Sequence, residues 1–242
     1  KHLPLLRARM AEQGLDGFVI PHEDEHQNEY LPEANERLAW ATGFTGSAGA
    51  AVVFRERASL FTDGRYTVQV KAQTDPALFE RRDLGELAAY LETAPKGAVI
   101  GYDPRLHSPD ALVPLRRAAL KAGAELKPVQ VNPLDLAWGD DRPAQPAAPV
   151  VPHPEEYAGE SHASKRARIG RAAAEAGADV ALLTAPSSIA WLFNVRGGDV
   201  IRSPLPIGQA LLQADGKARL FLDPSKVTNE LPEWLGDDVV VE

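Results

Sequence analysis

Cysteine is absent from this sequence of 242 residues, and methionine occurs only once. The absence of cysteine excludes disulfide bonds and thiolate chemistry. Positive charge is also in short supply, because 26 lysines and arginines face 34 aspartates and glutamates, which gives a net charge of -8. No run of lysine or arginine forms a local basic patch, so we expect no nucleic-acid partner.

Long apolar runs are missing as well. No segment approaches the roughly 20 apolar residues that span a bilayer, and the first residues lack the apolar stretch of a signal peptide. We therefore expect no membrane contact, and a cytoplasmic location. The chain is 44% hydrophobic and 25% charged, which is ordinary for a globular protein, and its length allows one large or two ordinary domains.

The most informative stretch runs from Leu38 to Tyr66. It contains a loop with the sequence GFTGSAG (residues 43–49), two apolar segments typical of strands, and an Asp63-Gly64 turn. Glycine recurs every third residue in the loop, which permits positive φ angles or a close approach of the backbone. The pattern is not the G-x-G-x-x-G of dinucleotide sites, and a strand instead of a helix should follow it, so a nucleotide site is not indicated.

Two domains are predicted from the order of the elements. An opening helix, a buried strand at Gly17–Ile20 and further helices and strands up to Glu125–Val129 form the first α/β unit. Residues 143–154 are rich in proline and alanine and almost uncharged, which is typical of a linker with polyproline character. The pattern then restarts with a helix at Ala163–Ala176. We predict domains at 1–142 and 155–242, joined by the linker 143–154.

The two predicted domains share an order of similar segments. Gly14–Ile20 parallels Gly177–Leu183, Leu38–Trp40 parallels Ile189–Trp191, and Ala58–Asp63 parallels Ala218–Asp223. Three matches in one order indicate a duplication, with Trp40 and Trp191 expected at equivalent buried places. Because the second copy has Ser225 where the first has Arg65, we expect the polar function on the first copy.

An acidic segment, His22 to Tyr30, is interpreted as too polar for the core. Its first residues, HEDEH, match the zinc-peptidase pattern H-E-x-x-H, in which two histidines share a helix face and the glutamate is the base. Pro21 precedes the motif and follows a strand, which places His22 in a loop or a first helical turn, and no third ligand follows at the expected spacing. A zinc site at His22, Glu23 and His26 therefore stays a distant alternative to a solvated acidic loop or a polar loop beside a substrate cleft.

Several motifs together resemble one known family. They are GFTGSAG followed by an apolar strand and TDGRY (62–66), P-x-x-D-x-H-x-x-E-Y (21–30), LAW (136–138) with DRP (141–143), and AWLFN (190–194) with Arg196-Gly197. In this order they resemble the N-terminal region of the three-domain, cytosolic-type Xaa-Pro aminopeptidases, of the creatinase/prolidase family. The resemblance implies an α/β fold of two tandem creatinase N-terminal-like domains (ribonuclease H-like motif). Each would be a mixed β-sheet flanked by helices, with the second domain truncated.

The resemblance also implies an activity for an intact enzyme. Such enzymes remove the N-terminal residue that precedes proline, with two divalent metal ions, usually manganese, bound in a C-terminal domain. The metal motifs of that domain do not occur here, so we expect no catalytic residue and no metal ligand in this chain, and no activity from it alone. It would shape the entrance for peptides with proline in second position and support a homodimer. A free-standing α/β module that binds peptides or small molecules is the alternative.

Three residues are expected to serve the substrate, namely Asp24, His26 and Arg65. By the resemblance, Asp24 and His26 belong to a polar loop near the substrate cleft. Arg65 follows Asp63, a good N-cap, at a helix start where a cation opposes the macrodipole. Its planar fork suits a peptide carbonyl or carboxylate. A structural salt bridge is the competing interpretation of Arg65.

Overall fold

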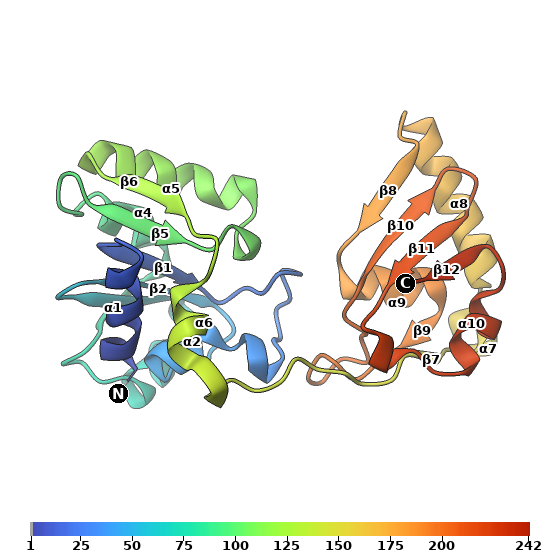
Figure 1. Ribbon diagram of the computed structural model, residues 1–242, viewed down its shortest axis with the longest axis horizontal. Helices are drawn as coiled ribbons and strands as arrows, with labels where there is room; N and C mark the ends of the chain where they lie inside the picture. Colours follow the sequence, from blue (N-terminus) through green and yellow to red (C-terminus); the bar gives the residue numbers. More distant parts are fainter. Residues whose placement is uncertain (1) are drawn as a thin grey trace. The chain divides into compact units, whose positions relative to one another are not determined.

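The computed structural model describes residues 2–242 and separates into two compact units. The first ends at Ala144 and the second begins at Gln145 (Figure 1). No helix in residues 2–242 is long and apolar enough to cross a bilayer. Each unit is an α/β domain with its own sheet and core.

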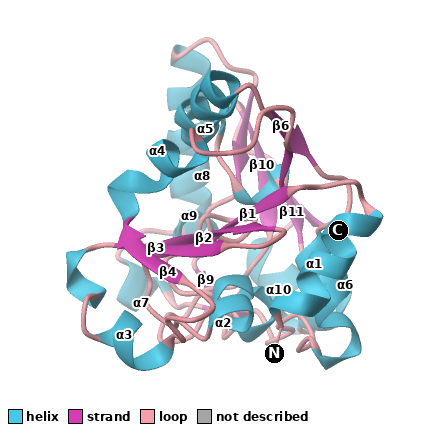
Figure 2. Ribbon diagram, turned by 90° about the vertical axis from the view of Figure 1, so that its left-hand side faces the viewer, coloured by secondary structure: helices cyan, strands magenta, loops and turns pink. Residues whose placement is uncertain are grey.

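Six strands form the sheet of the first unit, in the order β4-β3-β2-β1-β5-β6. They are β1 (Gly17–Pro21), β2 (Gly49–Phe54), β3 (Ala58–Thr62), β4 (Glu80–Asp83), β5 (Val99–Tyr102) and β6 (Glu125–Pro128). Strand β2 runs antiparallel to β1 and β3, whereas the other neighbouring pairs are parallel. Strands β1 to β4 lie side by side in Figure 2. The five remaining strands therefore end at the same edge of the sheet.

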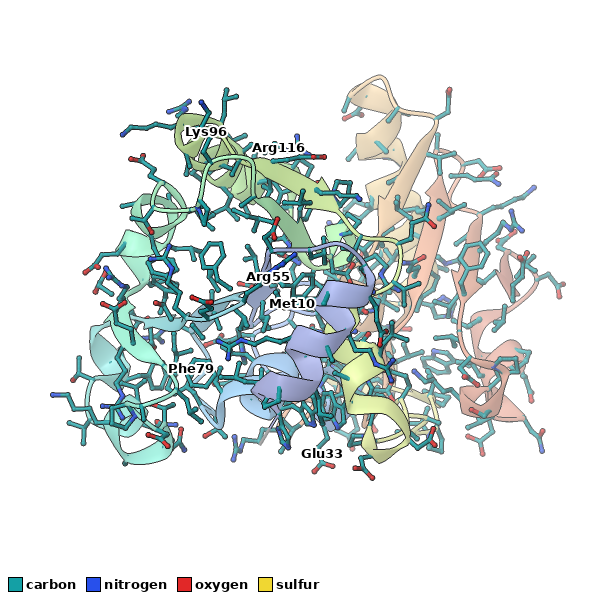
Figure 3. The ribbon with its side chains drawn as sticks, turned by 60° about the vertical axis from the view of Figure 1, so that its left-hand side comes forward. Met10, Glu33, Arg55, Phe79, Lys96 and Arg116 are labelled. Carbon is teal, nitrogen blue, oxygen red and sulfur yellow. The ribbon has the colours of Figure 1, made fainter. Side chains whose placement is uncertain are left out.

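Helices cover both faces of this sheet, because alternate strand residues point to opposite faces. Phe18 and Ile20 pack in one cluster with α1 (Leu3–Glu12), α2 (Arg37–Thr42) and α6 (Pro133–Trp138). This cluster includes Met10 on α1 and Phe79 (Figure 3). Val19 packs in the other, with α4 (Leu87–Leu91) and α5 (Pro109–Ala122). Because both faces of the sheet are buried, the sequences of β1 and β2 are continuous apolar runs.

The second unit has a four-stranded sheet in the order β12-β11-β10-β8. Its strands are β8 (Val180–Leu183), β10 (Gln209–Gln213), β11 (Ala218–Phe221) and β12 (Val239–Val241), with β7 (Val151–Pro152) and β9 (Val195–Arg196) forming a separate pair. Four helices accompany them, α7 (Glu155–Ala158), α8 (His162–Glu175), α9 (Pro186–Phe193) and α10 (Glu230–Leu235).

The two sheets have the same pairing pattern. In the second unit β8, β10 and β11 pair antiparallel in succession and β12 adds in parallel to β11, as β1, β2, β3 and β4 do in the first. The strands of the predicted duplicated segments, β1 with β8 and β3 with β11, occupy matching places in the two sheets. This shared topology supports the duplication that the sequence indicates.

Trp191 differs from the prediction of a buried core residue. It lies on α9 as Trp40 lies on α2, yet its side chain is 44% exposed. Trp40 is half-buried because His2 and Trp138 of α6 stack on it, with ring centroids 4.3 and 5.5 Å away. In the described part of the second unit no aromatic ring stacks on Trp191, and the cations of Lys165 and Arg168 contact its ring instead.

The proline-rich stretch joins the second unit before the predicted start of that domain. Val150 is fully buried and forms a β-bridge with Val227, and Val151–Pro152 is strand β7. The backbone N–H of Val150 also donates to the carbonyl of Lys226 at 2.8 Å. The boundaries 1–142, 143–154 and 155–242 remain predictions.

Candidate functional site

The carboxyl edge of the first sheet gathers polar side chains at consecutive strand ends. Asp63 follows β3, Asp83 is the last residue of β4, and Asp103 and Asn132 follow β5 and β6. Each side chain accepts a hydrogen bond from the backbone N–H two residues later, at 2.9, 2.8, 3.0 and 2.9 Å. Such local bonds turn the chain sharply as it leaves the sheet. Ligands of α/β sheets bind outside the carboxyl ends of strands, so this edge is the candidate site.

The acidic loop 22–30 follows β1 at the same edge, and Asp24 organises it. The Asp24 side chain is 0% exposed. It accepts hydrogen bonds from the backbone N–H groups of His26 (2.9 Å) and Asn28 (3.0 Å) and from the Asn28 amide (2.8 Å). The prediction that the segment is too polar for the core is wrong at this residue, because the loop's own N–H groups replace water around the carboxylate.

His22 and His26 do not share a helix face, because the segment that contains them is a loop. His22 is buried, with Nε2 3.2 Å from the carbonyl oxygen of Glu29. No three histidine or acidic side chains within residues 2–242 come together as a metal site. The H-E-x-x-H arrangement of zinc peptidases is therefore not formed here, and the described residues do not fit a metal centre.

Arg65 projects from the short 3₁₀ turn Gly64–Tyr66, and its side chain is 61% exposed. Its guanidinium forks onto Asp63, with Nη2 2.7 Å from Oδ2 and Nε 3.1 Å from Oδ1. This hydrogen bonding lowers the pKa of Asp63. Asp63 is therefore the salt-bridge partner that a structural role of Arg65 requires. The pair is exposed to solvent, where an ion pair adds little stability.

The glycine-rich loop of residues 43–49 contacts this edge of the sheet through a side-chain hydrogen bond. Gly43 ends α2 with φ of +82°, and a Cβ on Gly49 would lie 2.9 Å from the carbonyl oxygen of Phe61. Both uses of glycine expected from the sequence occur. The Ser47 hydroxyl lies 2.8 Å from the Tyr66 hydroxyl, which ties the loop to the turn that carries Arg65.

Two arginines of this region, Arg37 and Arg105, were not predicted from the sequence. Arg37 is only 2% exposed and pairs with Asp135 of α6 and with Glu25 of the acidic loop, at 2.8 and 3.1 Å. Arg105 forks onto Asp103 as Arg65 does onto Asp63, with Nη2 2.9 Å from Oδ2. The repeated pattern D-x-R at 63–65 and 103–105 was a signal that could have identified the second fork.

Acidic side chains and guanidinium groups therefore lie next to one another along this edge of the sheet. The hydrogen bonds that the Arg105 guanidinium donates to Asp103, with further contributions from the charges of Glu25 and Asp135, raise the pKa of Arg105. Glu29 contributes in the same direction to the pKa of Arg65, after Asp63 and Tyr66. A pocket of about 390 Å³ opens at the ends of β3 and β4, lined by Asp63 and Asp83 among others. Such an edge suits binding of a peptide by hydrogen bonds and charge.

Known proteins match this chain over its whole length. Models of the creatinase/prolidase N-terminal domain match residues 3–133 and 141–242. The probable Xaa-Pro aminopeptidase P of Ajellomyces dermatitidis is 35% identical over 247 residues, covering 100% of this chain and 40% of the relative. That of Aspergillus niger is 36% identical, with the same coverage. The chain thus spans about two fifths of the length of these curated relatives.

A solved structure has the same fold. The X-prolyl aminopeptidase of Caenorhabditis elegans, described as a cytosolic enzyme with a di-nuclear active site, superposes with a TM-score of 0.91 at 26% identity. The match covers 100% of this chain and 42% of the nematode protein. The chain belongs to the creatinase/prolidase family, contains two of its N-terminal domains one after the other, and corresponds to the N-terminal part of Xaa-Pro aminopeptidase P.

Proposed function

We propose that this chain is the non-catalytic N-terminal part of a metal-dependent Xaa-Pro aminopeptidase, which removes the N-terminal residue preceding proline. The observation that carries the proposal is the match of 100% of this chain to about two fifths of each curated relative. The nematode relative has a di-nuclear site, whereas residues 2–242 offer no cluster of ligands for a metal. Two divalent ions, manganese in our expectation, would be held outside these two domains.

Within the proposed enzyme, the carboxyl edge of the first sheet would line the approach of the peptide. Arg65 supports this role because its guanidinium is exposed and preoriented by Asp63. His26 is half-buried on the acidic loop, and its backbone N–H is held by Asp24. Arg65 and His26 would contact substrate, whereas buried Asp24 would act by fixing the loop.

The remaining features of the proposal concern the whole protein. The substrates would be peptides with proline in second position, as the names of the relatives suggest. A cytoplasmic location is supported by the cytosolic nematode relative. We also propose a homodimer for the intact enzyme, and the domain boundaries 1–142 and 155–242.

A peptidase assay tests the proposal. The 242-residue chain and the protein encoded by the complete reading frame are incubated with manganese and with a peptide that has proline second. A peptide with alanine second is the matched control. We expect cleavage by the longer protein only, and of the proline peptide only. Cleavage by the 242-residue chain that Glu23→Gln abolishes would overturn the proposal in favour of a zinc peptidase. A reading frame without any metal-binding domain would instead favour the free-standing module.

A further inference from the structure

The second unit contains a pocket of about 360 Å³ where α7, α8, α9 and β9 meet. Its lining includes three basic residues, His153, Lys165 and Arg196, and none of the described lining residues is acidic. This is notable in a chain whose net charge is -8. Apolar side chains, among them Trp191 and Leu205, complete the wall.

Lys165 is the most deeply placed of these cations, with a side chain only 3% exposed. Its Nζ donates to Oδ1 of Asn194 at 2.6 Å and to the carbonyl oxygen of Trp191 at 3.1 Å. An ammonium group has three N–H donors, so one is left without a hydrogen-bond acceptor in the described chain, although Nζ also lies 4.6 Å from the centre of the Trp191 ring. Within residues 2–242 no carboxylate forms an ion pair with Lys165, and the nearby Glu160 pairs with Arg168 at 2.7 Å instead. Buried charges are normally paired, which makes this cation a site for an anion.

Arg196 and His153 face the same space as Lys165. The only hydrogen bond of the Arg196 guanidinium to a described residue joins Nη1 to the carbonyl of Val195, at 2.9 Å. Burial, together with the positive charges of Arg196 and Lys165, lowers the pKa of His153. Lys165 and Arg196 thus bring two positive charges to one pocket, and a bound anion would compensate them.

We propose that this pocket binds a small organic carboxylate, with the carboxylate between Lys165 and Arg196 and its apolar part against Trp191 and Leu205. The planar fork of arginine matches a carboxylate in a bidentate geometry. An inorganic anion would leave the apolar part of the wall, formed by Trp191 and Leu205, unused. All of the residues that line this site belong to the second domain.

Nuclear magnetic resonance of the Trp191 indole N–H tests the assignment in the 242-residue chain. N-acetyl-L-leucine is the probe, and its amide, which has the same apolar body without the charge, is the matched control. We expect the acid to shift the Trp191 resonance saturably while those of Trp40 and Trp138 stay in place. The amide should give no saturable shift.

Substitutions of single residues identify which positive charge binds the carboxylate. Arg196→Gln should weaken binding of the acid roughly tenfold or more, as expected for the loss of one charge-assisted hydrogen bond. Arg168→Gln is the control, because Arg168 also contacts the Trp191 ring but does not line the pocket. His153→Gln provides a second lining variant, for which we expect weaker binding too. The assignment would be overturned if the acid gave no saturable shift or if the amide bound equally well. It would also be overturned if Arg196→Gln and Arg168→Gln had equal effects, or if inorganic phosphate competed equally tightly.

Discussion

Nε of Arg37 lies 2.8 Å from Oδ1 of Asp135, which joins α2 to α6 across 98 residues of sequence. Nη2 of the same guanidinium reaches Glu25 at 3.1 Å, so this buried arginine also anchors the acidic loop. Arg142 adds a second cation to Asp135, at 2.9 Å. The loop at the candidate site is therefore held by charges that belong to the fold of the first domain.

Replacing Arg37 should destabilise the first domain. Arg37→Met leaves Glu25 and part of Asp135 without a buried partner, and we expect a loss of about 3 kcal/mol in the free energy of unfolding. Urea denaturation measures it. Arg9→Met is the control, because Arg9 pairs with Glu12 on the exposed face of α1, where we expect a change below about 0.5 kcal/mol. Equal denaturation midpoints for the two variants would contradict the anchoring role of Arg37.

A second buried ion pair should stabilise the other domain. Nζ of Lys226 lies 2.8 Å from Oδ2 of Asp199, and both side chains are buried. Lys226→Met leaves the Asp199 charge uncompensated, so we expect a loss of about 3 kcal/mol. Lys217→Met, at an exposed pair 3.9 Å from Asp215, is the matched control. If both lysine variants unfold at the same urea concentration, Asp199 does not depend on Lys226.

Stability should fall at mildly acidic pH because of His107. Its Nδ1 lies 2.9 Å from the carbonyl of Asp103, while its buried Nε2 has no partner in the described chain. Burial lowers the pKa of His107 below 6.5, although Asp103 and Glu23 oppose the shift. The unfolded state therefore binds the proton more readily, and stability is complete above pH 6.5 and declines as pH falls below it. Denaturation between pH 8 and pH 5 should show a smaller decline in His107→Gln than in the parent. An equal decline in both would assign the effect to other groups.

Sequence patterns predicted strands that contain apolar residues, such as β1, and missed β4, which contains none. Strand β1 and helix α9 could be read from apolar spacing, because packing dictates their residues. Strand β4, with the sequence ERRD, carries no apolar residue and pairs only at the edge of the sheet, so its place follows from backbone hydrogen bonds to β3.

The candidate site was predictable only in part. The capping role of Asp63 follows from local sequence, and the structure confirms it. The burial of Asp24 and of Arg37 depends on partners brought together by folding, which no local pattern encodes. Trp191 was predicted wrongly for the same reason, since the cover over Trp40 comes from Trp138, nearly 100 residues further along.

The most direct test of the substrate role of this edge is the kinetics of Arg65→Ala in the protein encoded by the complete reading frame. Arg9→Ala is the matched control, an exposed arginine that also pairs with a nearby acid. We expect Arg65→Ala to lower kcat/KM for a peptide with proline second by roughly tenfold or more. The melting temperature should stay unchanged, because the Arg65–Asp63 pair is exposed to solvent. Unchanged kinetics together with a melting temperature lowered by several degrees would contradict the account and make Arg65 a structural partner of Asp63.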